Sequence, residues 1–191
     1  MKTMNSTRLP LIDVISPINL PEELKKSIID IYLPANLNIQ NPKLEHDPRG
    51  QEYSACRFKI DDQNVAFRVA KTTPTKIGQF VTAWKRIKAN NVIEPYDTKD
   101  DINFLVIHAA DASHQGQFVF DKNILISQGI MSSNGKQGKL AFRIYPPWSK
   151  PIAKAAIKSQ NWQVKYFYSI NKNGSADLTR VQQLFKINSA S

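Results

Sequence analysis

The feature that most constrains the fold is a nearly continuous apolar run, INFLVIHA, at residues 102–109. Such a run is typical of a strand that is buried on both faces of a sheet. Apolar periodicity and turn residues predict further strands at 53–60, 64–71, 117–120, 140–145 and 163–170. They predict helices at 21–33, 74–88, 121–127, 152–160 and 178–186, and a loop at 34–51. We therefore expect an α+β fold with a mixed, mainly antiparallel sheet and helices packed on it, in one domain over residues 1–191.

Residues 53–71 have the alternation of an antiparallel hairpin. If Asp61 faces Asn64, the apolar side chains of the two strands share one face, because side chains alternate along a strand. Arg57, Lys59 and Arg68 then point to the other face. In this register Lys71 pairs with Ser54, and Glu52 is its diagonal neighbour.

A helix is predicted at 74–88 because Thr73 can cap it and Pro74 suits the first helical position. Its apolar face contains Trp84, which we expect in the core. Lys71, Thr73 and Lys76 would surround the helix N-terminus, where free N–H groups and the helix dipole favour an anion.

The formal net charge is +10, and its distribution is uneven. Residues 63–93 and 122–176 contain no Asp or Glu. Segregated positive charge produces a surface that attracts phosphate backbones. The same charge would equally suit an acidic protein partner.

The single cysteine, Cys56, excludes an intramolecular disulfide and a Cys-rich zinc site. It lies in a strand-like run and is expected to be a buried, inert thiol. His108 is expected to be a buried core residue. Residues 1–17 lack the apolar stretch of a signal peptide, and no segment is long enough to cross a bilayer, so a cytoplasmic protein is expected. No cofactor or metal site is predicted.

Several segments together resemble one bacterial family, the MepB-like proteins. They are FRVAKTTPTKIGQFVTAWKR (67–86), GQFVF (116–120), GK…FRIYPPW (138–148) and AIKSQNWQVKYF (156–167). The resemblance is strongest over residues 52–167. It implies a small cytoplasmic bacterial protein and specifies no activity.

Glu52 and Lys71 form half of a metal-dependent nuclease site. The order helix–hairpin–helix–strand is similar to the core of PD-(D/E)XK nucleases, in which two carboxylates hold a metal and a lysine helps to activate water. In that pattern the second acid stands two residues before the lysine, where this chain has Val69. An ion pair between Glu52 and Lys71 at a sheet edge is the simpler interpretation.

The sequence favours a basic protein that binds DNA or RNA through phosphate contacts. A degenerate nuclease and a regulatory module with an acidic protein partner remain alternatives. Arginine and lysine interleaved with aromatic residues suit phosphate and base contacts. The candidate contact residues are Arg68, Lys71, Thr73, Lys76, Lys85, Arg86, Arg143, Tyr145, Trp148 and Lys150.

Overall fold

The computed structural model describes residues 19–45, 47–87 and 91–186. Its centre is a six-stranded sheet in the order β1-β2-β3-β8-β9-β11. Only the β3–β8 pairing is parallel; every other neighbouring pair is antiparallel. The strands are β1 (Ile39–Leu44), β2 (Cys56–Ile60), β3 (Gln63–Val69), β8 (Phe104–Ala110), β9 (Gln115–Asp121) and β11 (Phe167–Ile170). The α+β class and the mainly antiparallel sheet are confirmed.

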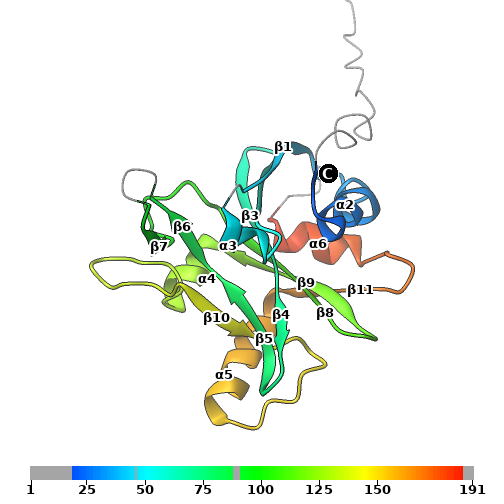
Figure 1. Ribbon diagram of the computed structural model, residues 1–191. Coiled ribbons are helices and arrows are strands. Elements are labelled where there is room, and N and C mark those ends of the chain that lie inside the picture. The colour runs from blue at the N-terminus through cyan, green and yellow to red at the C-terminus, as the bar shows by residue number, and fades with distance from the viewer. Residues whose placement is uncertain (1–18, 46, 88–90, 187–191) are drawn as a thin grey trace, which may run out of the picture.

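Helices cover both faces of this sheet (Figure 1). Helix α2 (Glu22–Ser27), the π-helix η1 (Ile28–Tyr32) and α6 (Leu178–Leu184) contribute to a core with Phe67, Phe104 and Val106. Helices α4 (Lys122–Ser127) and α5 (Lys154–Gln163) contribute to the core on the other face, with Leu105 and Phe118. A short helix, α3 (Pro48–Gln51), and a 3₁₀ turn, η2 (Val164–Tyr166), complete the helical elements of the described chain.

Strand β8 is the buried centre that the apolar run predicted. It pairs on both sides, and all its residues except Ala110 are buried. His108 lies within it with 5% of its surface exposed, and Cys56 on β2 is fully buried. The expected burial of both residues is confirmed.

The helix predicted at 74–88 is wrong. This segment forms β5 (Lys76–Thr82) and β6 (Trp84–Arg86), and residues 88–90 lie outside the described chain. Strand β5 lies between β4 (Lys71–Thr73) and β10 (Ala141–Ile144) in a three-stranded antiparallel sheet. Strand β6 pairs with β7 (Ile93–Pro95), which buries Trp84 to 7% exposure as expected.

Two local predictions also need correction. The hairpin places Ile60 opposite Gln63, two residues away from the expected register, although an even shift leaves each side chain on its predicted face. The predicted loop at 34–51 contains the edge strand β1 and α3. The β1 pairing shifts between Gln40 and Lys43, around Pro42, and proline is tolerated at such an edge irregularity.

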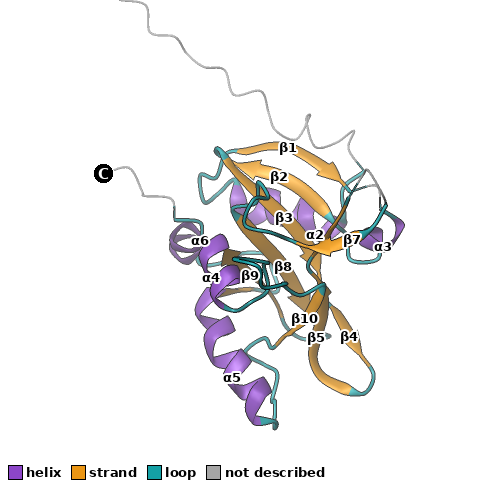
Figure 2. Cartoon of the chain, turned by 90° about the vertical axis from the view of Figure 1, so that its left-hand side faces the viewer, coloured by secondary structure: helices purple, strands orange, loops and turns teal. Residues whose placement is uncertain are grey.

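None of the described helices has the length and apolar character required to span a bilayer. The segment 1–17, on which the expectation about a signal peptide rests, lies outside the described residues. Figure 2 shows the three-stranded β4–β5–β10 sheet extending below the main sheet, beside α5.

Candidate functional site

The outer face of the three-stranded sheet brings the predicted basic residues together. Phe80 on β5 pairs directly with Lys71 on β4 and with Arg143 on β10, so the three side chains project from one face. The opposite face carries Gln79, which is buried and faces the core. Its Nε2 donates to the backbone oxygen of Ala110 at 2.6 Å and anchors the small sheet to the end of β8.

Two aromatic rings lie between two cations along this outer face. Lys71 Nζ lies 4.8 Å from the ring centroid of Tyr53, and the Tyr53 and Phe80 rings are 6.2 Å apart. Arg143 Cζ lies 6.0 Å from the centroid of Phe80. All four residues are half-buried. We call Lys71, Tyr53, Phe80 and Arg143 the cation–aromatic row.

Arg143 is held in position by neighbouring strands. Its guanidinium donates to the backbone oxygen of Gly78 at 3.1 Å and to Thr73 Oγ1 at 2.6 Å. Gly78 has a φ of +81°, and a Cβ there would lie 2.7 Å from the ring of Tyr145, so only glycine fits this approach. The arginine therefore presents its charge from a constrained position.

Gln163 connects this face to α5. It is 1% exposed, and its side chain accepts a hydrogen bond from the Tyr145 amide and donates one to the Arg143 backbone oxygen. Because the Gln163 side chain that makes both bonds is buried, the two bonds fix β10 relative to α5. The exposed Lys154 and Lys158 on α5 then extend the positive charge beside β10.

The Glu52–Lys71 pair predicted from the sequence is present, with Lys71 Nζ 3.5 Å from the carboxylate. Both side chains are well exposed, at 66% and 43%, so the pair contributes little stability. Burial, helped by the neighbouring Glu52 carboxylate, raises the pKa of Tyr53. The Tyr53 hydroxyl is therefore neutral near pH 7.

No second carboxylate completes a metal site beside Lys71. Glu45 is paired with Arg57 at 2.6 Å and Arg68 at 2.9 Å, and Asp47 is paired with Arg86. Among the described residues, no three His, Cys, Asp or Glu side chains lie close enough together to hold a metal. The replacement of the 74–88 helix by strands also removes the element order on which the PD-(D/E)XK comparison depended, and that core is not confirmed.

The anion site expected at a helix N-terminus is not formed, because no helix begins there. Thr73 and Lys76 pair across the tight β4–β5 turn, and Thr73 Oγ1 accepts from Arg143 instead of capping a helix. Lys76 is exposed at the turn that joins β4 to β5. Thr73 and Lys76 thus remain near the row, in a different local structure.

Arg68 does not belong to the surface. It is 2% exposed, and its guanidinium donates to Glu45, to the Tyr96 hydroxyl at 2.7 Å and to the Phe67 backbone oxygen at 2.8 Å. These contacts pair the charged guanidinium inside the protein, although its Nε atom has no hydrogen-bond partner among the described residues. The prediction that Arg68 contacts phosphate at the surface is therefore wrong.

The other candidates lie on β6 and in the loop after β10. Lys85 and Arg86 lie on β6 and pair with Asp100 and Asp47. Trp148 is half-buried, stacks on His114 with ring centroids 5.3 Å apart and packs against the core. Lys150 is exposed in the loop that follows β10.

Tyr53 and Phe80 are the site residues that the sequence analysis missed. Phe80 lies in the segment 74–88 that was predicted as a helix, yet as a strand residue it alternates with the buried Gln79 and Val81. The signal was available, because half of residues 71–82 are β-branched.

Comparison with known proteins agrees with this architecture. The MepB-like family model matches residues 47–169, which include the whole three-stranded sheet. The chain belongs to the MepB-like family. A solved structure, the crystal structure of MepB, is 34% identical over 79% of this chain and 97% of its own, with a TM-score of 0.67. No curated protein matches the chain.

Within this MepB-like chain, α2, η1, β1 and α6 lie outside the matched range 47–169. The cation–aromatic row lies entirely inside it. The helices α2, η1 and α6 on one face of the central sheet thus lie outside the family model, whereas the three-stranded sheet lies inside it.

Proposed function

We propose that this protein binds nucleic acid through the outer face of the β4–β5–β10 sheet, with little sequence preference. The observation that carries the proposal is that all three strands come from the two acid-free segments, 63–93 and 122–176. Folding places these two segments side by side, so their positive charges add at one surface. Phosphate backbones are the natural ligands of such a surface.

The cation–aromatic row favours single strands over duplex. Half-buried Tyr53 and Phe80 present ring surface between two cations, and unpaired bases can stack on such rings while lysine and arginine contact phosphates. Stacking depends little on base identity, which accounts for the lack of sequence preference. Thr73 and the exposed Lys76 and Lys150 would add further backbone contacts.

The test is a binding titration with labelled single-stranded DNA, single-stranded RNA and duplex at several salt concentrations. Three or four phosphate contacts predict a slope of log affinity against log salt of roughly −2 to −3 for single strands. Lys71→Ala should reduce that slope by about 0.7, because one contact is lost. Phe80→Ala should weaken binding by stacking loss, about 1–3 kcal/mol, with the slope unchanged.

The matched control is Lys99→Ala, an exposed lysine in the turn before β8, at the end of that strand opposite Ala110. It removes the same charge from the whole chain and should leave binding nearly unchanged. Equal losses in Lys71→Ala and Lys99→Ala would show that net charge alone is responsible and would refute the proposed surface.

The same titrations with Mg²⁺ or Mn²⁺ distinguish the nuclease alternative. Metal-dependent cleavage that disappears in both Glu52→Gln and Lys71→Ala would replace the binding proposal with a catalytic one. We expect intact substrate, since a lone carboxylate cannot displace enough of the ion's hydration shell.

A further inference from the structure

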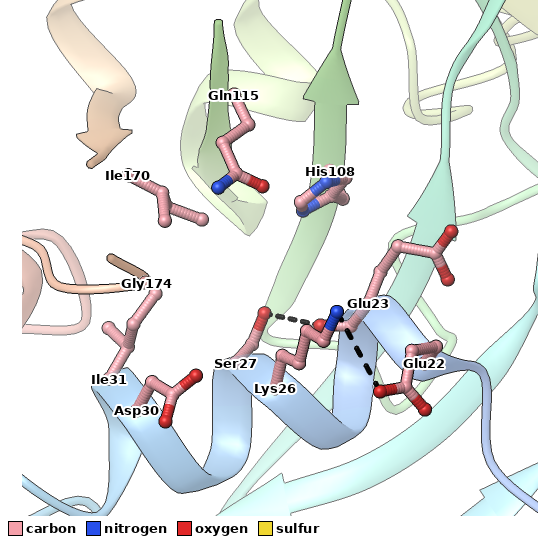
Figure 3. Close-up of a pocket in the computed structure, with 10 residues that line it drawn as sticks. All are labelled: Glu22, Glu23, Lys26, Ser27, Asp30, Ile31, His108, Gln115, Ile170 and Gly174. Atoms are coloured by element: carbon pink, nitrogen blue, oxygen red, sulfur yellow. Dashed lines mark hydrogen bonds and ion pairs between the residues drawn. The ribbon is translucent and has the colours of Figure 1, made fainter. Parts of the chain in front are cut away.

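A second site lies on the opposite face of the central sheet. A pocket of about 170 Å³ opens between α2 and η1 on one side and the ends of β8, β9 and β11 on the other (Figure 3). A single water needs about 10–15 Å³ of such volume, so the pocket accommodates a small organic molecule. Eight of its ten lining residues lie outside the range matched by the family model.

Two polar residues that line the pocket are buried, Ser27 and His108. His108 is 95% buried, since its exposed fraction is 5%, and its Nδ1 atom has no hydrogen-bond partner among the described residues. Burial lowers the pKa of His108, and Glu23 opposes that shift only in part, so the ring is neutral near pH 7. A buried polar nitrogen without a partner destabilises the protein unless something occupies the space beside it.

The mouth of the pocket is acidic, although the chain carries a net charge of +10. Glu22, Glu23 and Asp30 line it, together with Lys26. Lys26 reaches Glu22 at 3.8 Å, but both side chains are about two-thirds exposed, so this pair is weak. Three carboxylates and one ammonium leave a net negative charge above a neutral imidazole.

The carboxylate of Asp30 is held close to the loop after β11. Gly174 has a φ of +87°, and a Cβ there would lie 2.9 Å from Asp30 Oδ2. A side chain at position 174 would therefore displace the carboxylate from its place in the lining.

The wall of the pocket is rigidly supported. Ser27 Oγ donates to the Glu23 backbone oxygen at 2.6 Å and accepts from Gln117 Nε2 at 2.7 Å. The same Gln117 accepts hydrogen bonds from the buried hydroxyls of Tyr32 and Tyr168. The adjoining helix is a π-helix, a rare form that occurs often at functional sites.

The net negative charge of the pocket mouth favours a cation, and the arrangement of its side chains argues against a metal ion. Within the described chain, no cluster of three metal-ligating side chains is present here or elsewhere. An organic cation needs no such convergence, because its N–H groups can reach ligands that are spread around the pocket. The neutral imidazole of His108 can accept one of these hydrogen bonds.

We propose that this pocket binds a small primary ammonium or guanidinium compound, whose N–H groups donate to His108 and whose charge is balanced by Glu22, Glu23 and Asp30.

The proposal does not depend on nucleic-acid binding. The pocket borders one core, through Ile31 and Ile170, whereas β5 and β10 pack into the core on the other face of the central sheet, through Val81 and Ile144.

The test uses four probes of similar size in an NMR titration of the full chain with ¹⁵N-labelled histidine. Butylamine and butylguanidine carry charge and N–H donors, butyltrimethylammonium carries charge alone, and butanol carries neither. We expect the His108 ring resonances to move with at least one of the first two. Equal effects of butyltrimethylammonium, or no shift with either N–H cation, would overturn the proposal.

A comparison of two variants tests whether the cation binds in this pocket. Glu23→Gln should weaken it about three- to tenfold, as expected for one charge-assisted contact at a partly exposed position. Asp101→Asn is the matched control, because it removes the same charge from an exposed residue outside the pocket. Equal affinities in these two variants would place the cation elsewhere.

His108→Phe tests the hydrogen bond to the imidazole. If the variant keeps the thermal unfolding of the parent, its affinity for the N–H probes should fall to that for butyltrimethylammonium. If it does not fold, the Glu23→Gln comparison decides the proposal alone. Binding of an arginine- or lysine-rich peptide without binding of the small probes would also refute a small-molecule site.

Discussion

Removing the carboxylate of Glu45 should lower the free energy of unfolding, because it leaves the buried charge of Arg68 without its acidic partner. The Arg68 side chain is 2% exposed, and Glu45 is the acid within 2.9 Å of its guanidinium. Deleting one partner of a buried ion pair typically lowers the free energy of unfolding by about 3–5 kcal/mol, because the remaining charge stays desolvated. The Glu45 side chain is 22% exposed, so water can partly replace it, and we expect about 3 kcal/mol for Glu45→Ala.

Glu52→Ala provides the control within the same chain. Its pair with Lys71 is 3.5 Å long and well exposed, so its loss should cost under about 1 kcal/mol. Urea denaturation gives both free energies of unfolding. For a domain of this size, the Glu45→Ala loss corresponds to a fall in Tm of about 6–12 °C.

The double variant Glu45→Ala/Arg68→Met separates charge burial from packing. Replacing both charges removes the desolvated guanidinium, so the double variant should be more stable than Glu45→Ala alone. If Glu45→Ala and Glu52→Ala destabilise equally, the reasoning that Arg68 depends on a buried partner is wrong.

Two further predictions concern titratable groups. Burial raises the pKa of the Cys56 thiol to about 12, so the folded protein should resist thiol reagents at pH 8, and rapid labelling without denaturant would contradict this burial. Burial raises the pKa of Asp121, but hydrogen bonds from Lys186 and the Ile124 amide outweigh it, and the pKa lies below its usual range. The stabilisation from ionised Asp121 is therefore fully present above an unfolded-state pKa of about 3.9 and is lost as pH falls through the lower folded-state pKa. In urea denaturation at several pH values, Asp121→Asn should therefore reduce the loss of unfolding free energy at acid pH.

The candidate site was only partly predictable. Lys71, Thr73 and Lys76 were predicted to surround a helix N-terminus that is not formed, and Arg143 was predicted from its aromatic neighbours. The fold nevertheless gathers all four on or beside one small sheet. Phe80 was not predicted, because its role depends on pairing between β4, β5 and β10, and Tyr53 was not, because it reaches the row from the turn before β2. Arg68 was assigned to the surface because alternation distinguishes the two faces of a strand but not whether a face is covered.

The pocket beside His108 could not have been predicted at all. Its lining comes from residues 22–31, 108–115 and 170–174, which are brought together only when α2 and η1 pack on the sheet. From the sequence alone, His108 is predicted only to be a residue of a buried strand.

The sequence by itself determined the elements whose patterns are local and strong. These are the buried strand β8, the faces of the β2–β3 hairpin and the helix cap at Asp121, because burial, alternation and capping each depend on neighbouring residues. The tertiary structure alone decided segment 74–86, where apolar residues fit both a helical and a strand period. Residues 141–144, some 60 positions later, supply hydrogen bonds that hold β5 extended, whereas the β-branched residues of 71–82 favour a strand without excluding a helix.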